Sequence, residues 1–319
     1  MRRLVVASFA LAALTALTAP VAAQTTTTGC ATATSVACNS LSDVFSSLSS
    51  QLGGAIAGGS HTLGLGTTLG GFPHFAVAAR VNAVFSKLPD PRNATVAGAT
   101  STAAKLAANG ELIALPTLDA AVGVFEGIKL GVTKVGGVDV LASATYVPEL
   151  DISSLRVSPS AQYQLGYGVR IGLLEQSLLV PGVAVSILKR DLPSMDVAVK
   201  AKDATLSLTN YKVGTTSWRV AAQKNLLMLQ AAVGFGQDTY DASAKLGGSV
   251  GTLGSINANS KMTEKQNTLY GSLGLNLLLV KVIAEVGQVS GGDLNLLNPF
   301  DSNLTKKRYF ATLGARFSL

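Results

Sequence analysis

Apolar and polar residues alternate at every second position over many long segments of this chain. Between 75 and 85 the odd positions read Phe, Val, Ala, Val, Ala and Phe, whereas Arg80 and Asn82 stand at even positions. Successive side chains of a β-strand point to opposite faces, so such a segment has one wholly apolar face and one mixed face. The two terminal phenylalanines are separated by roughly 23 Å along a membrane normal if the strand is tilted by about 45°. This distance is close to the apolar height of about 25 Å of an outer-membrane barrel.

The same alternation returns in segments that begin near 138, 163, 227, 269 and 282, and two all-β folds are consistent with it. A soluble antiparallel sandwich also alternates, but it exposes a charged face to water. Here the second face consists mainly of Gly, Ser, Thr, Gln and Asn, and only 13% of all residues are charged, against roughly 25% in ordinary soluble domains. Many segments are also longer than the usual strand of about 5 to 6 residues. The pattern therefore predicts an all-β protein, a transmembrane antiparallel up-and-down β-barrel.

The strand count follows from the extent of each alternating segment. Twelve segments have strand character, at 61–71, 73–86, 120–132, 137–147, 161–173, 182–189, 196–208, 216–224, 227–238, 267–279, 281–289 and 307–319. If the glycine-rich stretch 240–258 forms a further hairpin, the count becomes fourteen. An even number places both ends of the barrel in the periplasm, with 239–266 and 290–306 outside and with 88–119 and 148–160 on the periplasmic side. The barrel must close on itself, because each unpaired backbone group in lipid costs several kcal/mol.

The first 23 residues have the organisation of a secretory signal peptide. Arg2 and Arg3 precede an apolar stretch of about 14 residues, and small residues lead up to Ala23. This stretch is shorter than the ~20 residues of a spanning helix, which disfavours a membrane anchor. A lipoprotein attached through Cys30 is disfavoured by the polar threonine run before that cysteine. We therefore expect a signal peptide at 1–23 and export of the chain.

Residues 24–58 form an N-terminal segment in front of the barrel, which we expect at 59–319. Within 39–57, apolar residues recur at helical spacing with serines between them. This helix is expected on the periplasmic side, either as a plug that enters the barrel or as an amphipathic helix against its rim. In an oxidising compartment, Cys30 and Cys38 are expected to form a disulfide.

On this register, a set of polar and charged side chains faces the interior of the barrel. The set comprises Arg80, Asn82, Lys129, Asp139, Gln164, Arg170, Arg219, Lys281, Glu285 and Arg316. Cations outnumber acids in it by six to two, which favours anions or neutral polar solutes over cations. The alternative is that these side chains pair with one another in a closed lumen. A barrel of twelve or more strands is wider than the eight that side chains alone fill, so we expect a channel, a ligand or a plug inside.

The sequence predicts no catalytic, metal or cofactor site. The chain has two histidines, His61 and His74, and no cluster with the spacing of metal ligands. A hydrolase would need a histidine beside a nucleophile and a third orienting group, and we interpret His74 as a rim or lumen residue instead. The cations are scattered despite a net charge of +7, so nucleic acid is not an expected partner.

Tyr309, Leu313 and Phe317 share one unbroken apolar face that reaches the final residue, Leu319. In this the last eleven residues resemble the C-terminal assembly signal of bacterial outer-membrane barrels, although that signal usually ends on an aromatic residue. The resemblance implies recognition by the barrel-assembly machinery and insertion into the outer membrane of a Gram-negative bacterium. Outer-membrane lipid would then surround the barrel.

Three functions are compatible with such a barrel. The first is a porin-like pore or transporter for small solutes or hydrophobic molecules. In size, N-terminal helix and disulfide, the chain is similar to the long-chain fatty acid transport barrels, a family with fourteen strands and an N-terminal plug, but none of that family's binding residues can be matched. The second is a non-enzymatic structural or interaction barrel, such as an anchor or a component of a complex. An outer-membrane hydrolase is the least favoured of the three, so we expect no enzymatic activity and at most a small-molecule cargo.

Overall fold

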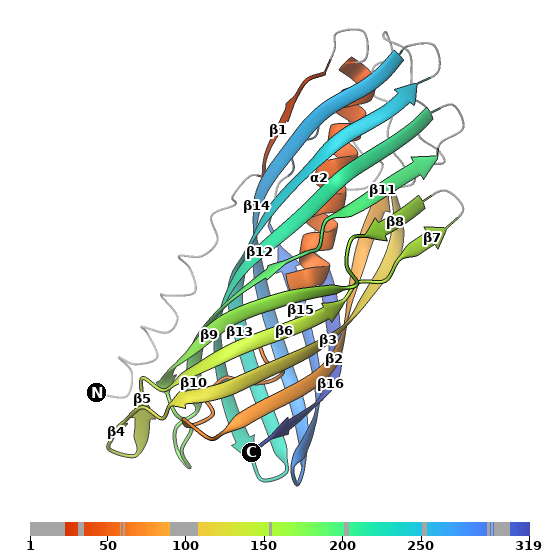
Figure 1. Ribbon diagram of the computed structural model, residues 1–319. Helices are drawn as coiled ribbons and strands as arrows, with labels where there is room; N and C mark the ends of the chain where they lie inside the picture. Colours follow the sequence, from red (N-terminus) through yellow and green to blue (C-terminus); the bar gives the residue numbers. More distant parts are fainter. Residues whose placement is uncertain are drawn as a thin grey trace.

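Ten antiparallel strands close into one barrel in the described part of the chain (Figure 1). The computed structural model describes residues 23–30, 35–57, 59, 61–89, 108–152, 155–200, 204–250, 254–291, 294, 296 and 307–319. In order around the wall the strands are β2 (Phe75–Pro89), β3 (Ala108–Phe125), β6 (Val138–Tyr146), β9 (Tyr163–Leu174), β10 (Gly182–Asp191), β12 (Ala204–Leu226), β13 (Leu229–Val250), β14 (Gly254–Leu277), β15 (Val280–Ser290) and β16 (Arg308–Ser318). The last strand, β16, pairs with β2 and completes the ring.

The expected count of twelve or fourteen strands is therefore wrong, and one error lies at 61–71. Part of this segment is an irregular chain inside the barrel and forms no strand. Gly64 and Gly70 adopt positive φ angles of 68° and 98°, a left-handed conformation that a strand cannot contain. The alternation of glycine with larger residues in this segment has the same period of two as a barrel strand, which is why the pattern was misleading.

The other error concerns 196–208 and 216–224, which were predicted as two strands of the wall. Residues 204–226 form the single strand β12, and β11 (Met195–Lys200) pairs with the upper part of this strand as an addition to the ring. The stretch 240–258 adds no hairpin either, because its described residues continue β13 and β14.

These corrections change the side on which several connections lie. We call the end of the barrel that holds the C-terminus the lower end. β2 ends and β3 begins at the upper end, and β6 likewise ends where β9 begins, so the connections predicted at 88–119 and 148–160 do not leave the wall on the C-terminal side as expected. Residues 108–119 of the first connection belong to β3, and 90–107 lie outside the described residues. At the lower end, two-residue turns connect β12 to β13 and β14 to β15, and the small hairpin of β4 (Ile128–Leu130) and β5 (Thr133–Val135) lies between β3 and β6.

The strands differ greatly in length, and the longest ones extend the wall upward on one side. β12, β13 and β14 contain 23, 22 and 24 residues. The pairing of β14 with β15 ends at Asn267 and Ser290, and above it β1 (Gln24–Thr28) pairs with β14 instead. On the other side, β11, β8 (Leu155–Pro159) and β7 (Leu150–Ile152) continue the sheet beyond β12. A strand of 24 residues rises about 55 Å along the axis at a tilt near 45°, roughly twice the apolar height of an outer-membrane barrel.

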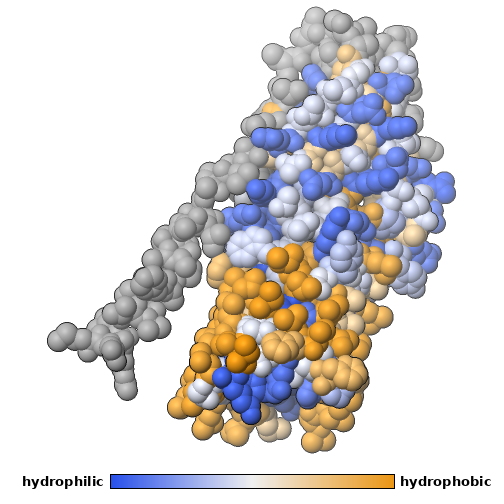
Figure 2. Space-filling model, turned by 60° about the vertical axis from the view of Figure 1, so that its left-hand side comes forward, coloured by the Kyte–Doolittle hydropathy of each residue, from blue (hydrophilic) through white to orange (hydrophobic). Residues whose placement is uncertain are grey.

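The outer surface divides into a polar upper half and an apolar lower half (Figure 2). On β14, Lys261 and Lys265 face outward above the division, and Leu269 and Leu273 face outward below it. Exposed Val, Leu, Ile, Tyr and Phe side chains of the other strands continue this lower belt around the barrel. The predicted outward orientation of the apolar face is thus confirmed for the lower half of the wall.

The helix α2 (Ser35–Ala57) lies along the inner face of the extended wall, against β2, β3, β12, β13 and β14 (Figure 1). Phe45 packs edge-on against Tyr211, with 5.9 Å between the ring centroids. Gly53 allows close approach to β13, because a Cβ atom there would lie 2.7 Å from the ring of Tyr240. Cys30 and Cys38 form a disulfide that joins the start of the helix to the chain after β1. No helix in the described ranges is long and apolar enough to span a membrane.

The N-terminal segment was expected on the same side as the C-terminus, but it does not begin at the end of the barrel that holds the C-terminus. β1 pairs with the upper part of β14, from Gln24 opposite Thr263 to Thr28 opposite Asn259. The helix then descends through the upper half, and the chain continues to the lower end, where β2 begins at Phe75 beside the C-terminal Leu319. Residues 24–30 and 35–57 therefore lie in the half of the molecule away from the C-terminus.

Candidate functional site: the occupied lumen

The lumen is filled by the chain's own N-terminal part, which we call the plug: α2, Gly59 and residues 61–74. Phe45 in the helix is fully buried, and so is Leu63 in the irregular part below it. The helix fills the upper half, and the irregular part runs down through the belt. Because the plug continues directly into β2, it is covalently attached to the wall at the lower end.

Polar side chains of the wall bind the backbone of the irregular part of the plug. Arg316 and Gln230 donate to the carbonyl oxygens of Leu63 and Gly64. Gly66 donates its N–H to Gln223 Oε1 over 2.9 Å. These bonds satisfy backbone groups that have no sheet partner, which is required of polar groups buried away from water.

The lower part of the helix is held in the same way. Asn82 Nδ2 donates to the Ala55 carbonyl over 3.0 Å, and Arg190 Nη1 donates to the Ile56 carbonyl over 3.3 Å. Arg308 Nη1 donates to the Ser50 carbonyl over 2.9 Å. The carbonyls of Ala55 and Ile56 are among the last four of the helix, which lack intrahelical partners and carry its partial negative charge, so side-chain donors suit them. The Ser50 carbonyl lies further inside the helix and accepts from Arg308 in addition.

Three buried ion pairs link neighbouring strands inside the barrel. Arg80 Nε lies 2.6 Å from Asp119 Oδ2, Arg170 Nη2 lies 2.9 Å from Asp139 Oδ2, and Arg219 Nη1 lies 2.8 Å from Asp238 Oδ1. All six side chains are buried. Each arginine has an acidic partner, so these three cations do not form an unpaired basic ring along the lumen.

The predicted lumen residues fall into three groups. Buried inward positions are occupied by Arg80, Asn82, Asp139, Gln164, Arg170, Arg219, Glu285 and Arg316. Lys281 is half-buried at the lower end, near Arg316. Lys129 is exposed on β4 and does not face the lumen, because the hairpin of β4 and β5 projects from the lower end of the wall.

Several residues that hold the plug or pair with the predicted set were missed. They are Asp119, Arg190, Asp238, Glu264 and Arg308. Asp119 and Asp238 could have been found by extending the alternation through the ends of the predicted strands. Glu264 and Arg308 lie in or near the upper half, where outward residues are polar as well and the alternation loses its contrast.

Neither histidine forms a catalytic arrangement that a substrate can reach. His61 Nδ1 lies 2.8 Å from Ser186 Oγ, but both side chains are buried between plug and wall. His74 Nδ1 is bonded to the Gly71 carbonyl at the lower end, over 2.9 Å. The described residues also contain no group of three or more His, Cys, Asp and Glu that could hold a metal ion.

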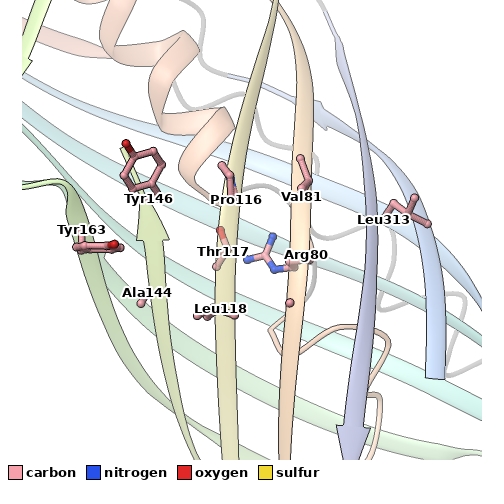
Figure 3. A pocket seen from close by; sticks show the side chains of 10 residues that line it. Arg80, Val81, Pro116, Thr117, Leu118, Ala144, Tyr146, Tyr163 and Leu313 are labelled. Atoms are coloured by element: carbon pink, nitrogen blue, oxygen red, sulfur yellow. The ribbon is translucent and has the colours of Figure 1, made fainter. Parts of the chain in front are cut away.

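A second hollow lies on the outside of the wall, where β3 continues upward beyond the end of β6 (Figure 3). Its volume is about 370 Å³, and outward side chains line it, among them Val81, Pro116, Leu118, Tyr146, Tyr163 and Leu313. Arg80 backs the hollow but bonds to Asp119 on the inside. This hollow belongs to the apolar belt and is separate from the lumen.

No family model matches this chain, and no curated protein does. Solved structures similar to it include the outer-membrane protease OmpT of Escherichia coli, at 9% identity, with 79% of this chain and 99% of that chain covered and a TM-score of 0.31. The outer-membrane channel DcaP of Acinetobacter baumannii matches at 10% identity, 77% and 96% coverage and a TM-score of 0.20. OpdK of Pseudomonas aeruginosa matches at 7% identity, 78% and 99% coverage and a TM-score of 0.15. At these values no activity or ligand is transferred to this chain.

Proposed function

We propose that this chain is an outer-membrane β-barrel with a permanently closed lumen, a non-enzymatic structural or interaction protein that presents its upper half at the cell surface. The occupied lumen is the observation that carries the proposal. Wall side chains bind the plug backbone at Ser50, Ala55, Ile56, Leu63 and Gly64. The plug is also tethered at both ends, by β1 on β14 and by its continuation into β2. Because the plug is bound to the wall at several points and tethered at both ends, we infer that it stays in the lumen and keeps it closed.

The orientation follows from the connections and the belt. Short turns and the C-terminal strand lie at the lower end, which is the periplasmic end in barrels of this class. The barrel-assembly machinery would engage β16, whose outward face resembles the assembly signal. The polar upper half, about as tall as the belt, then projects from the membrane as a surface for a partner. In this orientation the mature N-terminus lies outside the cell and the C-terminus inside the periplasm.

The orientation predicts which sites react with a membrane-impermeant maleimide on intact cells. Thr26 and Asn210 are exposed in the upper half, and Lys129 is exposed at the lower end. We expect Thr26→Cys and Asn210→Cys to be labelled on intact cells, and Lys129→Cys to be labelled only after the outer membrane is permeabilised. Labelling of Lys129→Cys but not Thr26→Cys on intact cells would reverse the orientation.

A plug-gated pore is the second candidate, and the polarity of the lumen favours it. The inner wall carries Arg, Asn, Gln and Ser side chains, as the water-filled interiors of porins do. If the plug were displaced, small polar solutes would have a hydrophilic path. The structure supports a transporter of hydrophobic molecules less well, because an apolar cargo would have to pass along the polar inner face of the wall.

Single-channel conductance separates the two candidates. For the full chain in planar bilayers, we expect no conductance steps, because plug and wall are bonded at every level. A variant that lacks residues 35–71 tests whether the wall alone conducts, and its steps would also show that the protein inserts under the same conditions. Regular steps from the full chain would contradict the closed barrel and establish the pore.

A further inference from the structure

The turns at the lower end of the barrel are strongly apolar. The turn between β12 and β13 consists of Leu227 and Met228, and the turn between β14 and β15 consists of Leu278 and Leu279. Leu178 and Leu179 lie in the connection between β9 and β10. All six side chains are exposed, and the exposed fraction reaches 99% at Leu227 and 100% at Leu278.

Leucine is an unusual residue at two of these positions. Leu227 and Leu278 have positive φ angles of 53° and 57°. Two-residue hairpin turns favour Asn, Asp or Gly there, because a branched side chain in the left-handed conformation clashes with the backbone. A chain that places leucine at such positions accepts backbone strain and gains nothing from an aqueous environment.

On β14, the apolar belt is shorter than the apolar band of a membrane unless the turns are counted as part of it. From Leu269 to Leu277, the outward apolar face of β14 rises roughly 19 Å along the membrane normal at a tilt near 45°. The apolar band of an outer-membrane barrel is about 25 Å tall. Outward residues of β15, such as Val280 and Val282, begin directly at the turn without a polar collar. On this side of the barrel the belt therefore includes the turns, whose leucines are exposed.

Side chains also satisfy the backbone carbonyls in and around these turns. Lys224 Nζ donates to the carbonyls of Ser177 and Leu178, over 2.9 and 2.8 Å. Asn276 donates its side-chain amide to the Leu227 carbonyl over 3.2 Å and its backbone N–H to the Met228 carbonyl over 2.8 Å. Turns in water leave such carbonyls to the solvent, whereas backbone groups in hydrocarbon must be satisfied within the protein.

We propose that the turns at 178–179, 227–228 and 278–279 form a lipid-inserted edge, immersed in the acyl chains of the periplasmic leaflet. The inference rests on the proposed membrane location. The occupant is lipid because the turn at 278–279 continues the belt of β14 and β15, and because carbonyls of the turns at 178–179 and 227–228 have hydrogen-bond partners within the protein. The Lys224 ammonium, which lies beside these two turns, is bound to the carbonyls of Ser177 and Leu178. The hairpin of β4 and β5 lies at the same end of the barrel and exposes Ile128, Leu130 and Val132, but it also carries Lys129 and Lys134. We place the two ammonium groups of this part of the rim in the headgroup region, because a charge in hydrocarbon is costly.

Single cysteines labelled with an environment-sensitive fluorophore test the proposal in the full, disulfide-bonded chain. The protein is reconstituted into phosphatidylcholine vesicles that contain lipids with a quencher on the acyl chain. Leu227→Cys and Leu278→Cys are expected to show the blue-shifted emission and the loss of fluorescence of Val286→Cys, whose side chain faces outward in the belt. Lys129→Cys, at the same end but at a charged position of the hairpin of β4 and β5, is expected to keep water-like emission and to escape quenching by the acyl-chain quencher.

The Val286→Cys control distinguishes a failure of the proposed membrane location from a failure of the lipid-inserted edge. If Val286→Cys is not quenched, the membrane location fails and the inference fails with it. If Val286→Cys is quenched but Leu227→Cys and Leu278→Cys show water-like emission, the barrel is in the membrane and its turns are not. The turns would then be a water-exposed surface for a periplasmic protein.

Replacing the turn leucines by asparagine gives a second test. The urea concentration at the unfolding midpoint should rise if the turns lie in water and fall if they lie in acyl chains. In water, Leu227→Asn and Leu278→Asn relieve backbone strain and raise the urea concentration at the unfolding midpoint. In acyl chains, the asparagine amide is costly and lowers this midpoint. We expect a lowered midpoint for both variants in vesicles, and a raised midpoint would overturn the proposal.

Discussion

Asp139→Ala is expected to lower the free energy of unfolding by about 3–5 kcal/mol, the cost of removing one partner from a buried ion pair. Asp139 accepts hydrogen bonds from Arg170 Nε over 2.9 Å and from the backbone N–H of Leu69, whose distances to the two carboxylate oxygens are 3.1 and 3.2 Å. The carboxylate thus joins β6, β9 and the plug. The substitution leaves the Arg170 charge buried without its acidic partner and leaves Leu69 N–H without its acceptor.

Urea unfolding in lipid vesicles measures this loss, with the fluorescence of Trp218, the single tryptophan, as the signal. The exposed pair Arg156–Glu149, with 3.8 Å between Nη2 and Oε1, provides the matched control. Glu149→Ala should cost less than about 1 kcal/mol, as is typical of exposed ion pairs. Replacing both buried partners, as in Asp139→Leu with Arg170→Met, should recover much of the loss, because no unpaired charge remains. A double variant that is as unstable as Asp139→Ala alone would contradict this account.

The belt is the part of the fold that sequence predicts well. The segments 73–86, 281–289 and 307–319 correspond closely to β2, β15 and β16. Their outward residues face an apolar surrounding and their inward residues face polar groups, so the contrast between alternate positions is large. The 3.6-residue spacing within 39–57 likewise indicated a helix, and α2 covers 35–57.

The upper half could not be predicted in the same way, because both of its faces carry polar residues. On β14, Lys261 and Lys265 point outward while Ser260 and Glu264 point inward, and this sequence has no apolar period of two. The path of 61–74 through the lumen was also hidden. Its glycines alternate like the small residues of a barrel strand, and only contacts with distant strands show that it is inside. The direction in which the plug enters depends on the pairing of β1 with β14, which no local pattern encodes.

Glu264 makes the attachment of the plug dependent on pH. It lies in the upper half of β14, above the belt, where Ser50 of α2 donates to its Oε1 over 3.0 Å and Gln266 donates to the same oxygen. Burial raises the pKa of Glu264 from 4.5 to about 7, although Arg308 and the bonds from Gln266 and Ser50 favour the charged form. Arg308 of β16 and Tyr240 of β13 are the other titratable groups that face it.

The raised pKa determines the sign of the pH dependence. Below about pH 4.5, the carboxyl group is protonated in the folded and in the unfolded chain, so the burial of Glu264 has no cost from ionisation. Between pH 4.5 and 7, the unfolded chain releases the proton while the folded chain retains it, and stability falls as the pH rises. Above pH 7 the full cost of about 3 kcal/mol applies.

Glu264→Gln is therefore expected to be about as stable as the natural chain at pH 4 and more stable by about 3 kcal/mol at pH 9, in unfolding experiments in vesicles. The glutamine retains an oxygen that accepts from Ser50 and carries no charge that burial would penalise. Ser50→Ala removes a donor that favours the charged carboxylate, so it should shift the pH-dependent loss to higher pH. If the natural chain instead gains stability with rising pH relative to Glu264→Gln, the attraction of Arg308 outweighs burial. The plug would then be attached most strongly when Glu264 is charged, the reverse of the expected dependence.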